Sequence, residues 1–284
     1  MGRMGGDAPR QTSSSRPPQA RGARRFRPKW AHRLTAPLRA LPNLLVIGAQ
    51  KAGTTSLHDF LGQQPEIRMS RIKECNVLWT PGWSLLGYRS YFPRRSTCAS
   101  EGVRRIGESS PFYLFHPAAI EGARRLDAAT TDLRAIAILR DPVERAWSHY
   151  RHAQRWHHEG LSFEEALDRE EERIAQGGEA FRHYSYQARG HYAGQLARWY
   201  DLLGRGRVLV LDFEDVLSMQ PATRLEIARF LGLSRPLVGD LGRLNPGGGE
   251  RMPDAVRERL HATFRRSNEE LATLLGRRFP WMRA

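Results

Sequence analysis

The sequence predicts an α/β fold in which a mostly parallel sheet carries helices on both faces. Three short apolar runs, at residues 43–48, 133–139 and 207–213, are typical of buried strands, and helix-compatible segments separate them. Strands that alternate with helices indicate a parallel sheet that is covered on both sides. The chain of 284 residues, 40% of them hydrophobic, is long enough to bury a substantial core.

The first strand leads into the stretch GAQKAGTT, residues 48–55, and then into the helix-compatible run 54–63. Strand, glycine loop and helix in this order form the frame of a P-loop-type phosphate site. The loop departs from a Walker A motif, because Thr54 stands where that motif has its lysine and the lysine comes three positions earlier, at Lys51. A lysine that projects from the loop is well placed to neutralise the charge that develops on a single departing phosphate. It is less well placed to bind a β/γ-phosphate pair.

The start of the following helix also predicts phosphate binding. The backbone N–H groups of Gly53, Thr54 and Thr55 would face the ligand at the positive end of the helix dipole. The hydroxyls of Thr54, Thr55 and Ser56 add further donors. Taken alone, the same pattern also fits an ordinary strand-to-helix turn.

The strand at residues 133–139 brings a second polar group to the edge of the sheet. Arg140 and Asp141 follow this strand directly, and Pro142 opens the next helix at a position where proline is favoured. Ligands of parallel sheets sit beyond the carboxyl ends of the strands. We therefore expect Arg140 to lie near the glycine loop.

The remaining elements complete the predicted sheet and its cover. The segment RRIGES, residues 104–109, is typical of a strand that ends close to Glu108. Apolar residues at helical spacing predict helices around residues 196–203 and 256–275.

Seven stretches of the chain together resemble the carbohydrate (heparan sulfate-like) sulfotransferases that use 3′-phosphoadenosine-5′-phosphosulfate (PAPS), in particular soluble, bacterial-style members. They are IGAQKAGTTSLHDFL, RIKECNVL, GYRSYFP, GESSPFYL, ILRDPVERAWSHY, GHYAGQLARWYDLL and FRRSNEELATLLGRRFPW, within residues 42–282. The resemblance implies sulfuryl transfer from PAPS to a hydroxyl or amine of a carbohydrate, a glycosylated metabolite or a lipid.

The same resemblance implies a donor site. The family's K-x-G-T-T loop for the 5′-phosphosulfate matches KAGTT, and its L-R-[DN]-P-x-x-R-A-x-S-H-Y segment for the 3′-phosphate matches LRDPVERAWSHY. A planar guanidinium fits phosphate oxygens well. A third candidate lies in the late loop at residues 245–253. The residues assigned to PAPS in this way are Lys51, Ala52, Gly53, Thr54, Thr55, Ser56, Arg140, Ser148 and Arg251.

Glu74 is the catalytic base that the resemblance implies. It follows a second strand in chain order and matches the family's K-E-x-x-[FY]-F region, whose glutamate deprotonates the acceptor. Lys51 at the leaving oxygen and Lys73 at the sulfuryl group complete the implied catalytic set. Without the two nucleotide motifs, Glu74 would be interpreted as a solvated acidic side chain in a loop. Glu108 competes for the role, because it ends a predicted strand at the carboxyl edge of the sheet.

Two departures from the family pattern concern the acceptor. Asn76, Val77 and Leu78 follow Glu74 where many relatives have aromatic residues. Ser109 stands where several animal relatives have a lysine. The wall and the charge of the acceptor pocket are therefore expected to differ from those relatives.

The formal net charge of +15 is unevenly distributed, because residues 1–40 hold ten Lys and Arg against Asp7. Their Gly, Pro, Ser and Arg content predicts a disordered basic tail over residues 1–40, ahead of a sulfotransferase domain over 41–284. Trp30 and Leu34 are candidates to dock on that domain. Such a tail suits nucleic acid, an acidic membrane surface, an acidic partner or no partner at all. We expect no nucleic acid and keep a peripheral membrane contact open.

The sequence shows no apolar leader and no run of about 20 apolar residues, so no membrane span is expected. Cys75 and Cys98 do not make a disulfide framework or a metal site. A cytoplasmic protein is the simplest expectation.

Two other classes of function remain open at this point. A P-loop kinase or NTPase would need Mg²⁺ and a carboxylate at a strand end, a place that Asp212 occupies, although the displaced lysine argues against it. A nonenzymatic polyanion-binding protein would use the basic tail and the arginine-rich helices. A metal is not expected in the reaction, because cationic and N–H groups would already surround the leaving phosphate. The histidine cluster has no second group of Cys, Asp or Glu at ligand spacing and is typical of packing or surface residues. The cluster comprises His149, His152, His157 and His158.

Overall fold

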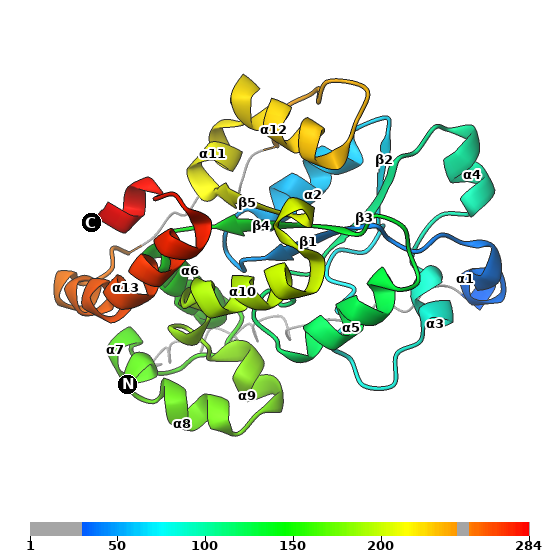
Figure 1. The fold of residues 1–284 in the computed structure, drawn as a ribbon. Helices are drawn as coiled ribbons and strands as arrows, with labels where there is room; N and C mark the ends of the chain where they lie inside the picture. Colours follow the sequence, from blue (N-terminus) through cyan, green and yellow to red (C-terminus); the bar gives the residue numbers. More distant parts are fainter. Residues whose placement is uncertain (1–29, 243–249, 284) are drawn as a thin grey trace, which may run out of the picture.

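The computed structural model describes residues 30–242 and 250–283, and a five-stranded parallel sheet lies at its centre (Figure 1). The strands are β1 (Leu44–Gly48), β2 (Ile67–Met69), β3 (Arg105–Ser109), β4 (Arg134–Leu139) and β5 (Val208–Asp212). Their order across the sheet is β2-β3-β1-β4-β5, and every neighbouring pair is parallel. The prediction of an α/β fold with a parallel sheet is confirmed.

Helices cover the sheet on both faces. The α-helices are α1 (Trp30–Leu34), α2 (Thr54–Gly62), α3 (Leu85–Arg89), α4 (Arg95–Ser100), α5 (Ala118–Asp127), α6 (Pro142–Arg155), α7 (Phe163–Asp168), α8 (Glu170–Ala175), α9 (Gly178–His183), α10 (Tyr192–Leu203), α11 (Phe213–Ser218), α12 (Pro221–Leu231) and α13 (Asp254–Leu275). Short 3₁₀ turns are η1 (Ala36–Leu38), η2 (Ala188–Gly190), η3 (Arg205–Arg207) and η4 (Pro280–Arg283). In Figure 1, α2, α11 and α12 lie above the sheet, and α5 and α10 lie below it. Across the described ranges, no helix has both the length and the apolar character that crossing a membrane requires.

The continuous apolar runs form strands because both faces of the sheet are covered. All five residues of β1 are buried, and so are the last five residues of β4. Central strands of a parallel sheet are enclosed on both sides and therefore lack the alternation of a half-exposed strand. A second apolar cluster joins α6, α7 and α13 through Tyr150, Phe163 and Phe264.

The order of the strands creates a crevice at the carboxyl edge of the sheet. β1 leads towards β2 and β4 leads towards β5, which are opposite directions across the sheet. Because β1 and β4 are neighbours, their outgoing loops diverge from adjacent points. Parallel sheets bind ligands at such points.

The disordered tail was predicted to extend to residue 40, but the last part of this segment is folded. Residues 1–29 lie outside the described residues, whereas residues 30–40 contain α1 and η1. Ala36 and Ala40 are buried, and the N–H of Ala40 donates to the carbonyl of Pro93 at 3.0 Å. The docking expected of Trp30 and Leu34 is wrong, because these side chains are 76% and 71% exposed. The folded part thus begins before residue 41. Small residues and backbone hydrogen bonds hold this segment in place, and neither produces an apolar pattern in the sequence.

Candidate active site

The loop after β1 approaches another part of the chain closely. A Cβ atom at Gly48 would lie 2.7 Å from the Cβ of Leu114 and 3.0 Å from the carbonyl oxygen of Pro111. Lys51 has a positive φ of 70° and Gly53 one of 80°, and α2 begins immediately afterwards. The N–H of Ala52 donates to the carbonyl of Ala49 at 3.2 Å. The loop therefore turns tightly and presents the start of α2 to the crevice.

The first turn of α2 has donors that the protein itself does not use. The first N–H groups of any helix lack partners inside the helix. Within the described part of the chain, the hydroxyls of Thr54, Thr55 and Ser56 make no hydrogen bond, and Thr54 and Ser56 are buried. These donors and the positive end of the helix dipole together can bind one phosphate or sulfate group.

Arg140 lies beside this loop, as expected from the position of β4 next to β1. Its Nη1 donates to the carbonyl of Lys51 at 3.3 Å, and its guanidinium carbon lies 4.8 Å from the centre of the Phe213 ring. The hydroxyl of Tyr192 donates to the Arg140 carbonyl at 2.9 Å. Ser148 lies two turns further along α6, and its hydroxyl has no hydrogen-bond partner among the described residues. The Arg140 guanidinium also lies 4.0 Å from the Glu144 carboxylate, a loose ion pair that leaves donors of Arg140 and the Ser148 hydroxyl available to a ligand.

The electrostatics of Lys51 indicate an excess of positive charge. Burial lowers the pKa of the Lys51 amine, and the charges of Arg155, Arg140 and then Lys73 lower it further, while Glu74 opposes them. Like charges held together in this way destabilise the ligand-free protein. A bound dianion such as a phosphate would offset that repulsion.

Glu74 reaches the same crevice from the segment after β2. Its backbone has a positive φ of 62°, and its N–H donates to the carbonyl of Ser109 at the end of β3, at 2.8 Å. The amine of Lys73 lies 2.9 Å from the Glu74 carboxylate. Burial acts to raise the pKa of Glu74, but Lys73, with smaller contributions from Arg182 and His152, lowers it overall. Glu74 is therefore ionised at neutral pH, the state that a general base requires.

Glu74 lines a small cavity of about 30 Å³. Arg189 forms one wall, only 4% exposed, with its guanidinium 4.6 Å from the centre of the Phe112 ring and hydrogen-bonded to the Gln50 side chain. Burial, followed by the charges of Arg145 and Arg182, lowers the pKa of Arg189 to about 9. The residues that line the cavity are Gln50, Glu74, Asn76, Pro111, Phe112, Arg182 and Arg189.

Glu108, the competing candidate base, is completely buried. Its carboxylate accepts hydrogen bonds from the hydroxyls of Tyr88, Ser110 (2.8 Å) and Tyr113 (2.6 Å). The Ser110 and Tyr113 oxygens in turn accept from the N–H groups of Asn76 (3.0 Å) and Leu78 (3.3 Å). Glu108 therefore fixes the segment that follows Glu74 and does not face the crevice.

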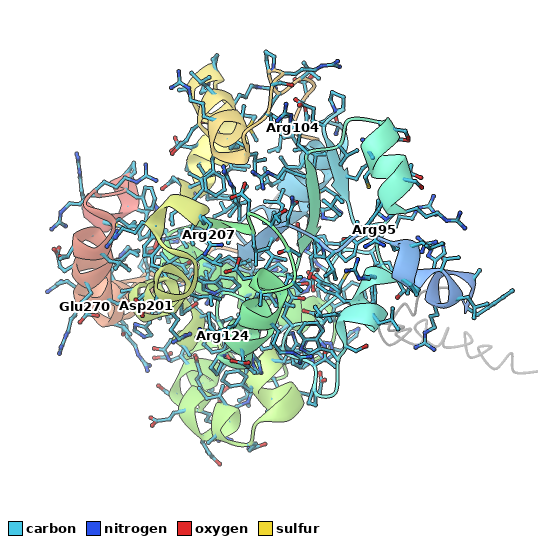
Figure 2. All side chains as sticks on the ribbon, turned by 45° about the vertical axis from the view of Figure 1, so that its right-hand side comes forward. Arg95, Arg104, Arg124, Asp201, Arg207 and Glu270 are labelled. Carbon is cyan, nitrogen blue, oxygen red and sulfur yellow. The ribbon has the colours of Figure 1, made fainter. Side chains whose placement is uncertain are left out.

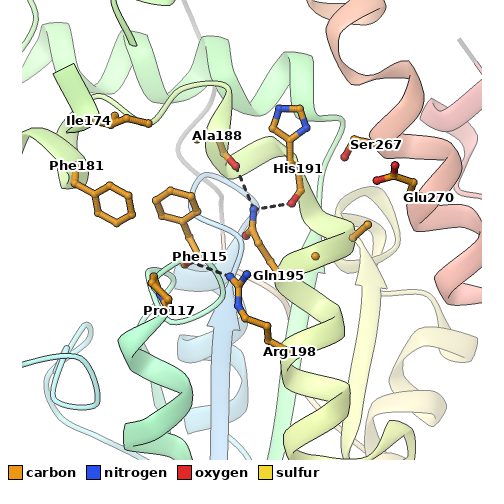
Figure 3. A pocket seen from close by; sticks show the side chains of 12 residues that line it. Phe115, Pro117, Ile174, Phe181, Ala188, His191, Gln195, Arg198, Ser267 and Glu270 are labelled. Carbon is orange, nitrogen blue, oxygen red and sulfur yellow. Dashed lines mark hydrogen bonds between the residues drawn. The ribbon is translucent and has the colours of Figure 1, made fainter. Parts of the chain in front are cut away.

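Phe115 and Phe181 line a larger groove of about 570 Å³ (Figure 3). These two rings stack 4.8 Å apart. Figure 3 shows Gln195 donating to the carbonyls of Ala188 and His191, and Arg198 donating to that of Phe115 at 3.3 Å. The groove offers an aromatic wall with a few polar groups, a common composition for a small-molecule site.

Several residues near the site were not predicted from the sequence. Burial and the neighbouring charges of Lys51 and Arg155 lower the pKa of His152 to about 4, which places this histidine beside the loop. Ser148, His152 and Arg155 are spaced by four and three residues, so they share one face of α6, and this spacing was the available signal. Arg182 and Arg189 come from α9 and η2, and no spacing pattern links them to the loop.

Two further candidates stand apart from these contacts. Arg251 is exposed, and residues 243–249 of its loop lie outside the described residues, so its assignment to PAPS stays a prediction. Asp212 accepts from the Glu214 N–H at 2.8 Å and from the Trp281 indole at 2.7 Å, so its oxygens cap α11 and hold the C-terminal turn. Within the described residues, no three His, Cys, Asp or Glu side chains are grouped as metal ligands.

Comparisons with known proteins agree with this architecture. A family model described as "Sulfotransferase domain" matches residues 41–241. Human bifunctional heparan sulfate N-deacetylase/N-sulfotransferase 2 is 28% identical over 271 residues, covering 84% of this chain and 30% of that protein. Membrane-associated sulfotransferase kil1 of Dictyostelium discoideum is 24% identical over 323 residues, covering 86% and 67%. The crystal structure of a sulfotransferase from Alicyclobacillus acidocaldarius superimposes with a TM-score of 0.69 at 32% identity, over 86% of this chain and 100% of that one. The chain therefore spans under a third of the human relative.

Proposed function

Since this chain belongs to the sulfotransferase domain family, we propose that it transfers the sulfuryl group of PAPS to a hydroxyl or amine of a small-molecule or carbohydrate acceptor. One observation carries the proposal. Lys51 after β1, Arg140 after β4 and the Lys73–Glu74 pair after β2 come from three separate segments and meet at one crevice. A cationic phosphate cradle next to an ionised carboxylate provides donor binding and base chemistry in one place.

The cradle fits the donor in two parts. The N-terminus of α2, with the hydroxyls of Thr54 to Ser56, would hold the 5′-phosphosulfate, and Arg140 with Ser148 would hold the 3′-phosphate. Lys51, close enough to Arg140 for their charges to repel, would neutralise the oxygen that leaves with the nucleotide. The single phosphate at the 5′ position explains why this loop does not need the lysine of a Walker A motif.

Glu74 would take the proton from the acceptor oxygen or nitrogen as that atom attacks sulfur. The bond between sulfur and the bridging oxygen breaks in the same step, and the electron pair leaves with adenosine 3′,5′-bisphosphate (PAP). Lys73, 2.9 Å from the Glu74 carboxylate, keeps this base ionised and brings a positive charge to the sulfuryl oxygens.

The walls of the Glu74 cavity favour an acceptor that carries negative charge near the reacting group. Arg182 and Arg189 line the cavity together with the Phe112 ring. Guanidinium groups pair with carboxylate or sulfate groups, and aromatic rings pack against the apolar faces of sugar rings. The larger groove that Phe115 and Phe181 line offers space for the rest of such an acceptor.

A calorimetric titration in one buffer tests the proposed donor. We expect tighter binding of PAP than of ATP, with little dependence on Mg²⁺. An NTPase would instead prefer ATP with Mg²⁺, and a polyanion-binding protein would prefer heparin, with a steep dependence on salt. Either preference would contradict the proposal.

An EDTA control tests the proposal that catalysis needs no metal. Lys51, Lys73, Arg140 and Arg155 already concentrate positive charge at the site, so electrostatic stabilisation of the leaving group need not come from a bound ion. Turnover of PAPS with a suitable acceptor should persist in EDTA. Activity that disappears with EDTA and returns with Mg²⁺ would show that an ion takes part.

A further inference from the structure

The end of the molecule built by α1, η1, α3 and α4 exposes large apolar side chains. Trp30 is 76% exposed, Leu34 71%, Leu38 56% and Leu86 53%. These are four of the seven most exposed large apolar residues in the described part of the chain. Their concentration at one end of the fold distinguishes them from apolar residues scattered singly over a surface.

Hydrogen bonds hold this end of the molecule together. Arg39 donates to the carbonyl of Phe92 at 2.6 Å, and Arg89 donates to the carbonyl of Arg39 at 2.6 Å. Arg95 donates to the carbonyl of Pro37 at 3.0 Å. The segment around η1 is therefore fixed on α3 and α4, and it presents a built surface rather than a loose end.

The same region is strongly basic. We define the α1–α4 surface as Trp30, Leu34, Leu38 and Leu86 together with Arg33, Arg39, Arg89, Arg94 and Arg95. Residues 30–43 and 75–100 contain no Asp or Glu. Within the described ranges, none of the five arginines forms an ion pair. Figure 2 shows Arg95 beside α1 at the margin of the molecule.

The positive charges of this surface repel one another and are not compensated by nearby carboxylates in the described part of the chain. Burial lowers the pKa of Arg39 and of Arg89, and the charges of Arg94 and Arg95, respectively, lower these pKa values further. A partner with negative charge would remove the repulsion. The chain's own residues 1–29 do not fit that role, because they carry eight Lys and Arg against a single Asp.

We propose that the α1–α4 surface docks on an anionic lipid membrane. Protruding Trp and Leu side chains would enter the boundary between headgroups and acyl chains, and the surrounding arginines would contact lipid phosphates. A nucleic acid would use the arginines but would gain nothing from Leu34, Leu38 and Leu86. In Figure 1, α9, whose Arg182 lines the Glu74 cavity, lies at a different side of the molecule from α1, so docking leaves that cavity accessible.

Vesicle binding by the full chain tests the proposal, with phosphatidylcholine vesicles compared with vesicles that also contain phosphatidylglycerol. The parent should sediment with the anionic vesicles and not with the neutral ones. Arg94→Gln with Arg95→Gln should weaken the partition constant by about fivefold per arginine. Trp30→Ser with Leu34→Ser should weaken it by about tenfold or more, because apolar insertion is lost.

Matched controls separate this surface from general charge and from the tail. Arg265→Gln with Arg266→Gln on α13 and Leu225→Ser on α12 change exposed residues elsewhere and should leave partitioning close to the parent value. PAP binding and the melting temperature check that every variant is folded. The tail is present in all of them, so it contributes equally.

Three results would overturn the proposal. The first is an absence of binding to anionic vesicles by the parent. The second is equal partitioning of the parent and the Trp30→Ser/Leu34→Ser protein, which would show that charge alone, or the tail alone, accounts for binding. The third is preferential binding of duplex DNA, with release from vesicles when DNA is added, which would assign the arginines to nucleic acid.

Discussion

At the scale of single residues, two neighbouring carboxylates receive different roles from their surroundings. Glu74 lines a cavity and its ionised form is favoured by Lys73, whereas Glu108 is sealed among three hydroxyl donors. Burial raises the pKa of Glu108, and the hydroxyl donors only partly oppose that shift. Of these two carboxylates only Glu74 lines a cavity, which supports its proposed role as the base.

The first prediction concerns Glu74→Gln. The substitution preserves shape but removes the basic oxygen, so kcat at saturating PAPS should fall by roughly 10²- to 10⁴-fold, as for loss of a general base. PAP affinity should stay close to that of the parent, because Glu74 does not line the phosphate cradle. Rate measurements beside calorimetry with PAP check both expectations.

Glu108→Gln is the matched comparison. An amide at this buried position turns one acceptor into a donor among hydroxyl donors, which should cost about 1–3 kcal/mol of stability. The remaining folded enzyme should keep far more activity than Glu74→Gln. A folded, inactive Glu108→Gln protein beside an active Glu74→Gln protein would reverse the two roles.

The second prediction concerns Arg140→Ala. Loss of a charge-assisted phosphate contact costs about 1.5–3 kcal/mol, which corresponds to a PAP affinity roughly 10- to 150-fold weaker. Arg266→Ala removes an arginine whose side chain is 93% exposed on α13, and it should leave PAP affinity unchanged. Calorimetry with both variants decides the matter, and unchanged affinity in Arg140→Ala would contradict the proposed donor site.

The sequence predicted the part of the candidate site that lies within short motifs. Lys51 and Thr54 lie in the loop and helix start that follow β1, and Arg140 follows β4 directly. Both strands are visible as apolar runs, so the meeting of these residues at one edge follows from the fold. Arg182 and Arg189 lie far along the chain in short elements, and only tertiary packing brings them to Glu74. The positive φ of Glu74 likewise depends on its contact with the end of β3 and has no sequence signature.

At the scale of elements, the contact between α5 and the segment after Glu74 is unusually close. A Cβ atom at Gly122 would lie 2.1 Å from the carbonyl oxygen of Leu78. Real Cβ atoms do not approach an oxygen so closely, so any side chain here must push the helix away. Gly122 thus lets α5 support the 74–78 segment directly.

The third prediction compares two helical glycines. Gly122→Ala should lower the free energy of unfolding by about 1–3 kcal/mol, because overpacking against Leu78 outweighs the better helix propensity of alanine. A Cβ atom at Gly194 in α10 would have no neighbouring atom within 4 Å. Gly194→Ala should therefore raise the free energy of unfolding, by up to about 1 kcal/mol. Urea unfolding of both proteins measures the difference. Equal stability of the two would show that α5 moves freely.

The elements that were predicted from sequence share a continuous apolar run or a long apolar stripe. β1, β4 and β5 are enclosed runs, and α10 and α13 carry stripes that face the core. The short helices α7, α8 and α9 span six residues each, which is too few for a helical period to be recognised. Their position depends instead on buried contacts such as the bonds from Gln187 and Ala188 N–H groups to Glu170.

At the scale of the whole molecule, the start of the folded domain is set by contacts rather than by composition. The basic, Pro-rich and Gly-rich composition extends to about residue 40, yet η1 is bound to the segment between α3 and α4 through Arg39 and Ala40. Small buried residues such as Ala36 escape a hydrophobicity pattern because alanine is common in tails and cores alike. Residues 1–29, the rest of the tail that the sequence predicts, lie outside the described residues.

The last prediction uses two truncations to locate this boundary. Removing residues 1–29 deletes only predicted tail and should leave the melting temperature and PAP affinity unchanged. Removing residues 1–41 also deletes the buried Ala36, Ala40 and Leu41 and the hydrogen bond of Arg39, at a cost of about 2–4 kcal/mol. For a domain of this size, that loss lowers the melting temperature by roughly 5–15 °C. PAP binding should persist at low temperature, since the crevice between β1 and β4 is built without these residues. Equal melting temperatures for the two truncated proteins would place the start of the domain after residue 41, and a large loss from removing residues 1–29 would show that the tail is part of the folded structure.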